Sequence, residues 1–100
     1  MLIPWVLKNC KFASPDVSQA DRDLEQDKQL VKQAIVMELQ ASSQYESMAT
    51  QVKNEHLKKV LLEVSREEKN HVGEFELVLG ELDKEFPKAV EEGMGEAKEI

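Results

Sequence analysis

Apolar residues recur at steps of three and four along most of the chain, which is the period of an amphipathic helix. The first such run begins between residues 15 and 20, where Ser18 is suited to cap a helix, and it ends near Lys53. Asn54 can cap a second run, which continues until Pro87 discourages further helix. The pattern therefore predicts two long helices that form an antiparallel hairpin through a tight turn.

The two ends of the chain lack this sustained period. Residues 1–17 are apolar at first and then mixed, so they predict an N-terminal arm. Residues 87–100 are acidic and loosely patterned, so they predict a C-terminal tail or a short helix. The expected organisation is an arm at 1–17, a helical hairpin at 18–86 and a tail at 87–100.

Three titratable residues interrupt the apolar faces of the hairpin: Glu38 in the first helix, and Glu68 and His71 in the second. An ionised carboxylate left alone on a core face costs several kcal/mol, roughly, so it requires protonation, an ion pair or a metal ion. Residues at i and i+3 share one helix face and lie about 4.5 Å apart along the axis. Glu68 and His71 are therefore placed to bind one metal ion or two adjacent ions.

The spacing of these residues from the turn brings them to one level. Glu38 lies about 16 residues before Asn54 and Glu68 about 14 after it, so in an antiparallel pair they stand within roughly one helical turn of each other. Tyr45 follows Glu38 by two turns on the same face. A lone Glu-x-x-His is common in acidic helices, but this combination favours a metal site. The alternative is a buried Glu68 to His71 ion pair that fixes the register of a helical dimer.

Composition agrees with a helical chain that associates. With 100 residues, 41% hydrophobic and 33% charged, and with only 4 Gly and 3 Pro, the sequence is typical of long helices, so we expect an all-α protein of one domain. Two helices leave too little core for a stable monomer.

Charge and cysteine content exclude several classes of function. The net charge of −7 argues against a nucleic-acid or anionic-membrane partner. The apolar start at Met1 to Leu7 lacks a basic segment and is short, so we expect neither a signal peptide nor a membrane span. One cysteine, Cys10, allows no internal disulfide and no CxxC metal site, which fits a cytoplasmic protein.

The sequence from Val36 to Tyr45, followed after a fixed interval by Glu67 to His71, resembles the encapsulated ferritin family, the half-length ferritin-like proteins packaged in encapsulin shells. The resemblance covers about residues 25–86. A looser similarity extends to one half of a rubrerythrin or ferritin bundle. Where the family tends to carry acidic residues beside its first ligand glutamate, this chain has Met37 and Gln40, which argues against a metal-uptake site there.

The resemblance implies a two-helix protomer that dimerises into a ferritin-like four-helix bundle. It also implies a di-iron site at the interface, with Glu38, Glu68 and His71 of both chains as ligands and two iron ions per dimer. Mn or Zn are alternative metals. A homodimer that assembles into a larger ring, and delivery into an encapsulin nanocompartment, follow from the same resemblance.

We therefore expect a ferroxidase that oxidises Fe(II) with O₂ and serves iron storage or detoxification. Tyr45 would assist Glu38, Glu68 and His71 by orienting a carboxylate or supplying an electron. Two alternatives remain. The first is a non-enzymatic helical interaction module with a structural metal or a buried ion pair, and the second is a rubrerythrin-like peroxidase half-domain.

Overall fold

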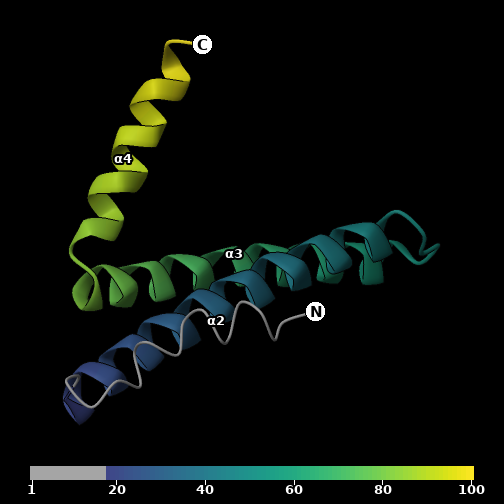
Figure 1. Ribbon diagram of the computed structural model, residues 1–100. Coiled ribbons are helices and arrows are strands. Elements are labelled where there is room, and N and C mark those ends of the chain that lie inside the picture. The colour runs from purple at the N-terminus through teal and green to yellow at the C-terminus, as the bar shows by residue number, and fades with distance from the viewer. Residues whose placement is uncertain (1–17) are drawn as a thin grey trace, which may run out of the picture.

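The computed structural model describes residues 18–100, which form three helices and no strand (Figure 1). Helix α2 spans Gln19–Ala49, α3 spans Glu55–Leu82 and α4 spans Glu85–Lys98. The predicted all-α class is confirmed. The predicted arm at 1–17, which includes Cys10, lies outside the described residues. Within the described part of the chain, no helix is both long and apolar enough to cross a membrane.

Side chains cap the start of both long helices. The Ser18 hydroxyl accepts a hydrogen bond from the backbone N–H of Asp21 at 3.1 Å, and the Asn54 side chain accepts one from Leu57 at 2.8 Å. Each cap satisfies a backbone N–H that has no partner within its helix. Both predicted caps are confirmed.

Helix α2 ends at Ala49, four residues before the expected end near Lys53. The hydroxyl and the backbone N–H of Thr50 both donate to the carbonyl of Ser47, at 2.7 and 3.1 Å. These bonds to the residue three positions back tighten the last turn and take the chain out of the α-helical path.

The second helix and the C-terminal segment are divided differently from the prediction. Helix α3 ends at Leu82, and α4 begins at Glu85, two residues before Pro87. A proline inside a helix collides with the carbonyl four residues earlier, which here belongs to Asp83. Asp83 is extended, with φ −134° and ψ 98°, and its side chain accepts a hydrogen bond from the Glu85 N–H at 3.1 Å. Pro87 thus falls in the first turn of α4, where its missing N–H costs nothing.

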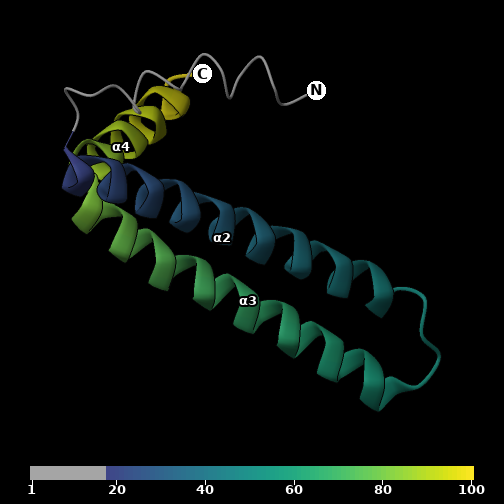
Figure 2. The ribbon, with the colours of Figure 1, turned by 60° about the horizontal axis from the view of Figure 1, so that its bottom comes forward.

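Helices α2 and α3 lie antiparallel and side by side, and α4 leaves the far end of α3 in another direction (Figures 1 and 2). The contact between α2 and α3 buries three hydrophobic side chains, Ala49, Leu61 and Leu79, together with Ser42 and Ser65. The core of one chain is therefore a single narrow stripe along each helix.

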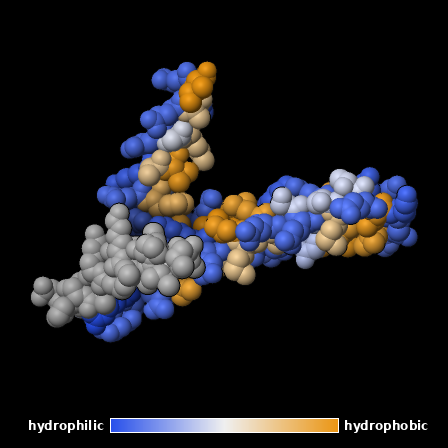
Figure 3. Space-filling view, turned by 45° about the vertical axis from the view of Figure 1, so that its right-hand side comes forward, coloured by the Kyte–Doolittle hydropathy of each residue, from blue (hydrophilic) through white to orange (hydrophobic). Residues whose placement is uncertain are grey.

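Each long helix carries a second apolar stripe beside the buried one. We call these two stripes the open apolar face. It is formed on α2 by Leu30, Ala34, Met37, Ala41, Tyr45 and Met48, is continued by Val52 in the connection after α2, and is formed on α3 by Leu57, Val60, Val64, Phe75, Val78 and Leu82. Fourteen large hydrophobic residues among residues 18–100 are exposed, six of them on this face. Apolar surface lies along the hairpin and along one side of α4 (Figure 3). Helices α2, α3 and α4 leave this surface largely exposed, as is typical of a surface that binds another molecule.

Leu79 provides a test of the narrow core, because its side chain is 0% exposed. We expect Leu79→Ala to lower the free energy of unfolding by about 2–5 kcal/mol, since it removes buried apolar contacts and leaves a cavity. Urea unfolding at one fixed protein concentration measures the change. Leu77→Ala is the matched control, because Leu77 lies on the same helix and is 68% exposed. Equal losses in the two variants would contradict the described packing.

Candidate metal centre

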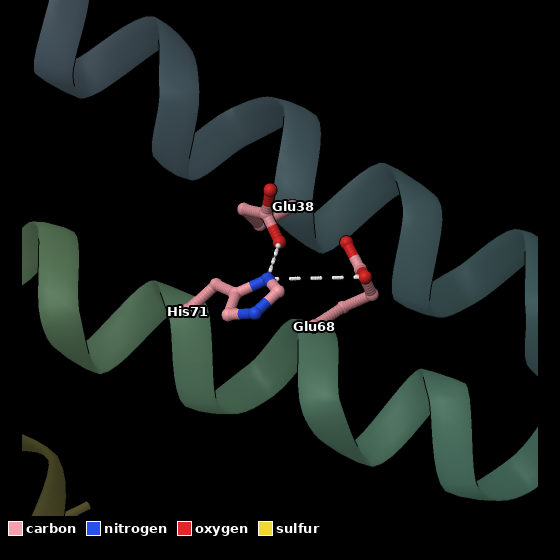
Figure 4. A group of neighbouring side chains, drawn as sticks. All are labelled: Glu38, Glu68 and His71. Atoms are coloured by element: carbon pink, nitrogen blue, oxygen red, sulfur yellow. Dashed lines mark hydrogen bonds and ion pairs between the residues drawn. The ribbon is translucent and has the colours of Figure 1, made fainter.

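Glu38 from α2 meets Glu68 and His71 from α3 (Figure 4). One potential ligand atom from each of the three residues lies within 4.8 Å of the others. His71 Nδ1 is 2.9 Å from Glu38 Oε2 and 3.8 Å from Glu68 Oε1. Counting residues on either side of the turn predicted that these side chains lie at the same height along the hairpin, and the structure brings them together there.

The cluster lies at the border between the buried stripe and the open apolar face. Glu38 follows Met37 of that face, and His71 occupies a position within its α3 stripe, between Val64 and Phe75. The two carboxylates are largely covered, with 21% and 18% of the side chain exposed, while His71 is 46% exposed. One chain thus covers the cluster on one side and leaves its other side open.

The carboxyl groups of Glu38 and Glu68 shift each other's pKa in opposite directions. A hydrogen bond from Glu68, followed by one from His71, lowers the pKa of Glu38 below its usual value. The pKa of Glu68 is raised, first by the hydrogen bond with Glu38 and then by burial. In the metal-free protein Glu38 is thus the better acceptor and Glu68 the group that tends to keep a proton. A cation between them would remove this conflict.

His71 directs Nδ1 at both carboxylates. Because an ionised carboxylate only accepts, Nδ1 carries a proton and donates a hydrogen bond to Glu38 Oε2. The pKa of His71 is raised above its usual value, chiefly by this hydrogen bond. A metal ion bound by Nδ1 would take the place of that proton, so metal binding and protonation exclude each other.

The donor set suits a divalent transition metal. Ligand atoms bound at about 2.1 Å lie at most about 4.2 Å apart, and both measured distances from His71 fall inside that limit. Two carboxylates and one imidazole suit Fe or Mn, whereas closed structural zinc sites more often use thiolates. Three ligands leave coordination positions for a second chain or a substrate.

Comparison with known proteins identifies the family. The sequence profile named Rubrerythrin matches residues 29–99. This chain belongs to the rubrerythrin family. The matched residues include all of α3, most of α2, and the cluster of Glu38, Glu68 and His71.

Two relatives of this rubrerythrin-family chain come from Pyrococcus furiosus. The chain is 43% identical over 72 residues to a ferritin-like-encapsulin shell fusion protein. The matched region covers 72% of this chain but only 21% of the fusion protein. A crystal structure of an encapsulated ferritin domain matches with a TM-score of 0.75 and 42% identity, over 77% of this chain and 79% of that one. The resemblance to the encapsulated ferritin family is confirmed.

Other candidate residues lie apart from the cluster. Within residues 18–100, no hydrogen bond joins Tyr45 to Glu38, Glu68 or His71, and Tyr45 is half-buried on the open apolar face. The titratable residues His56, Glu67 and Glu74 are exposed on α3. Glu74 contributes only a small part of the raised pKa of His71.

The sequence pattern did not reveal a second polar cluster beside the first. Ser42 and Ser65 are buried at the contact between α2 and α3, and their hydroxyl oxygens are 3.0 Å apart. Ser65 also donates to Glu46, whose carboxylate pairs with Lys69. The available signal was a serine on the buried stripe of each helix, where apolar residues would be expected.

The raised pKa of His71 predicts how the metal-free chain responds to pH. We expect its imidazole to titrate above the ordinary value of 6.5 and expect Glu38→Gln to lower the midpoint, because Glu38 is the main cause of the shift. The stability from this pair is complete below the ordinary pKa and is lost as pH rises through the raised one. NMR titration of a His56→Gln background, which leaves His71 as the one histidine, measures the midpoint. A value at or below 6.5 would contradict the contact.

Proposed function

We propose that this chain oxidises Fe(II) with O₂ at a di-iron site completed by a second copy. The observation that carries the proposal is the position of the Glu38, Glu68 and His71 cluster at the edge of an unpaired apolar face. Di-iron carboxylate bundles use a Glu from each of two helices and a Glu-x-x-His from each of the other two. One chain supplies half of that set, and a two-fold axis through the open apolar face supplies the rest.

The open apolar face supports association of two copies. Its exposed members include Leu30 at 54%, Met37 at 60% and Leu57 at 46%. Fully burying an exposed side chain of this size contributes about 1.5–3 kcal/mol, so covering the remaining half of each contributes roughly half of that. A C₂ interface pairs one patch with itself, so an apolar face flanking the ligands brings both ligand sets together. The pairing yields four helices around one centre, which is the architecture expected of a ferritin-like bundle.

In this site each residue has a distinct role. His71 and Glu68 would bind one Fe(II) in each half, because they lie one turn apart on α3. Glu38 would bridge the two ions or cap one of them. Fe(II) is the substrate: two ions supply two electrons, and with two protons O₂ becomes hydrogen peroxide while both ions become Fe(III). The carboxylates release the product by changing how they bind it.

Tyr45 would support this reaction from a distance. It lies on the open apolar face seven residues after Glu38, so the second copy would cover it and its hydroxyl would require a partner. A carboxylate in the metal site of the second copy is a suitable acceptor for the hydrogen bond that the Tyr45 hydroxyl would donate. Tyr45 would then orient that carboxylate or supply an electron.

We propose that the oxidation serves iron storage or detoxification in association with an encapsulin shell. The support is the Pyrococcus furiosus protein that joins a ferritin-like domain to an encapsulin shell. This chain spans about a fifth of that protein, so it corresponds to the ferritin-like part. Helix α4, with Val90 and Met94 exposed on its apolar side, offers a second surface through which dimers would build a larger ring.

One observation favours a non-enzymatic role as the second candidate. The 2.9 Å contact between His71 and Glu38 is an ion pair whenever the imidazole is protonated, and such a pair fixes the register of two helices without a metal. On that account the chain would be an interaction module. A peroxidase half-domain is a third candidate, supported by the rubrerythrin profile, and it would prefer peroxide to O₂ as oxidant.

Association should depend on metal if the site lies on a two-fold axis. Four carboxylates would meet there, so the metal-free interface carries mutual repulsion, and Fe(II) binds only the associated form. We expect anaerobic addition of Fe(II) to raise the mass measured by light scattering. An identical mass with and without Fe(II) would sink the shared-site proposal.

His71 separates the ferroxidase from the interaction module. We expect His71→Gln to reduce Fe(II)-dependent O₂ consumption by at least about 100-fold, since the loss of a metal ligand removes the site, while the helix content stays nearly unchanged. An oxygen electrode measures the rate, and replacing O₂ by hydrogen peroxide compares the oxidants. His56→Gln is the matched control and should oxidise Fe(II) at the wild-type rate. Full activity in His71→Gln would rule out this residue as a ligand.

A further inference from the structure

Ser65 is the centre of a hydrogen-bond network at the contact between α2 and α3. Its hydroxyl lies 3.0 Å from the Ser42 hydroxyl, 3.2 Å from the Ser42 carbonyl and 3.0 Å from Glu46 Oε2. Ser65 is 2% exposed and Ser42 is 4% exposed. Lys69 Nζ reaches the same oxygen of Glu46 at 2.7 Å. Three α2 oxygens therefore converge on one buried α3 hydroxyl.

The chemistry of the groups gives this network a direction. A hydroxyl has one proton and two lone pairs, so Ser65 can donate strongly to only one acceptor. Hydrogen bonds from Lys69 and then from Ser65 lower the pKa of Glu46, so its carboxylate is ionised and is the stronger acceptor. Ser65 thus donates to Glu46 and accepts from Ser42. The result is a chain of hydrogen bonds from Ser42 on α2 to Ser65 on α3 and from Ser65 to Glu46 on α2.

The network adjoins the metal ligands on both helices. Ser42 lies one turn after Glu38 on α2, and Ser65 lies one turn before Glu68 on α3. Ser65 and Lys69 bracket Glu68, and Glu46 binds both. The segment of α3 that carries Glu68 is therefore tied to α2 on either side of the ligand.

Register between the helices decides whether the ligands can share an ion. Apolar contacts are non-directional, so the remaining core residues, Ala49, Leu61 and Leu79, resist sliding only weakly. Sliding by one residue moves a helix by about 1.5 Å, whereas metal–ligand distances tolerate about 0.2 Å. Apart from the His71 to Glu38 contact inside the site itself, the bond between the buried hydroxyls of Ser42 and Ser65 is a directional contact that distinguishes one register from the next.

We infer that Ser42, Ser65 and Glu46 are positioning residues, which hold Glu38 and Glu68 at the separation that a metal ion requires. They touch no ligand atom and act through the register of α2 and α3. The inference rests on the proposed metal site.

The test compares Co(II) binding with stability in the full chain. The variant Ser42→Ala/Ser65→Ala removes both buried hydroxyls together. This change is nearly neutral for stability, because neither buried hydroxyl is left without its partner and Glu46, which loses Ser65, keeps its ion pair with Lys69. We expect its Co(II) affinity to fall about 10-fold to 100-fold, as for other groups that orient ligands, with altered visible absorption of the bound ion. Helix content, mass and the urea midpoint should stay close to wild type.

Two matched variants sharpen the comparison. Ser43→Ala removes an exposed hydroxyl next to Ser42 and should bind Co(II) as wild type does. Glu46→Gln keeps an acceptor for Ser65 and loses only an exposed ion pair, so it should retain most of the affinity. Glu46→Ala removes that acceptor but leaves the Ser42 to Ser65 bond, so its affinity should fall between those of Glu46→Gln and the double variant.

The outcomes separate this inference from the proposed site. Wild-type affinity in Ser42→Ala/Ser65→Ala, or a loss of affinity matched by an equal loss of unfolding free energy, would overturn the positioning role and leave the metal site standing. A wild-type chain that binds no Co(II), or whose binding survives His71→Gln, would overturn the site and the positioning role together.

Discussion

Two helices packed side by side bury one stripe of each, but α2 and α3 carry two apolar stripes each. This excess of apolar surface is the constraint on which the rest of the structure depends. The buried stripe holds the hairpin together, and the open apolar face requires a partner. The titratable cluster lies where the two stripes meet, so the position that brings Glu38, Glu68 and His71 together within one chain would also present them to a second copy in the proposed dimer.

Electrostatics and packing act in opposite directions at that border. Glu38 and Glu68 are close enough to shift each other's pKa in opposite senses, and His71 compensates only while it holds a proton. Apolar burial favours closing the open face, while repulsion between carboxylates resists it. A divalent cation would resolve this opposition, because it would neutralise the carboxylates and allow the apolar surfaces of two copies to pair. The rubrerythrin-family membership of the chain agrees with a metal in this role.

Periodicity in the sequence was sufficient for the helices and their caps, because apolar spacing and capping side chains are local properties. Counting residues from the turn also brought Glu38, Glu68 and His71 to one level, since a tight antiparallel hairpin leaves little freedom. The end of α3 was misplaced, because Pro87 acts on the carbonyl of Asp83 four residues earlier rather than at its own position. The link from Ser42 to Ser65 and Glu46 could not be predicted, because it depends on which rotamers meet across the helix contact and not on spacing along one helix. The pairing of two chains and the roles of the ligand residues and Tyr45 remain predictions.

The short connection between α2 and α3 also shapes how the chain reaches its native state. The residues from Thr50 to Asn54 join helices whose contacts all lie across one small loop, so closing that loop costs little chain entropy. This topology predicts that contacts near the loop form first, between residues close in sequence, and that pairing then extends past Ser42 and Ser65 to Glu38, Glu68 and His71. Local hairpin formation of this kind is rapid and does not depend on concentration. The protomer would therefore arrive at its first encounter with another copy with its half of the centre already assembled.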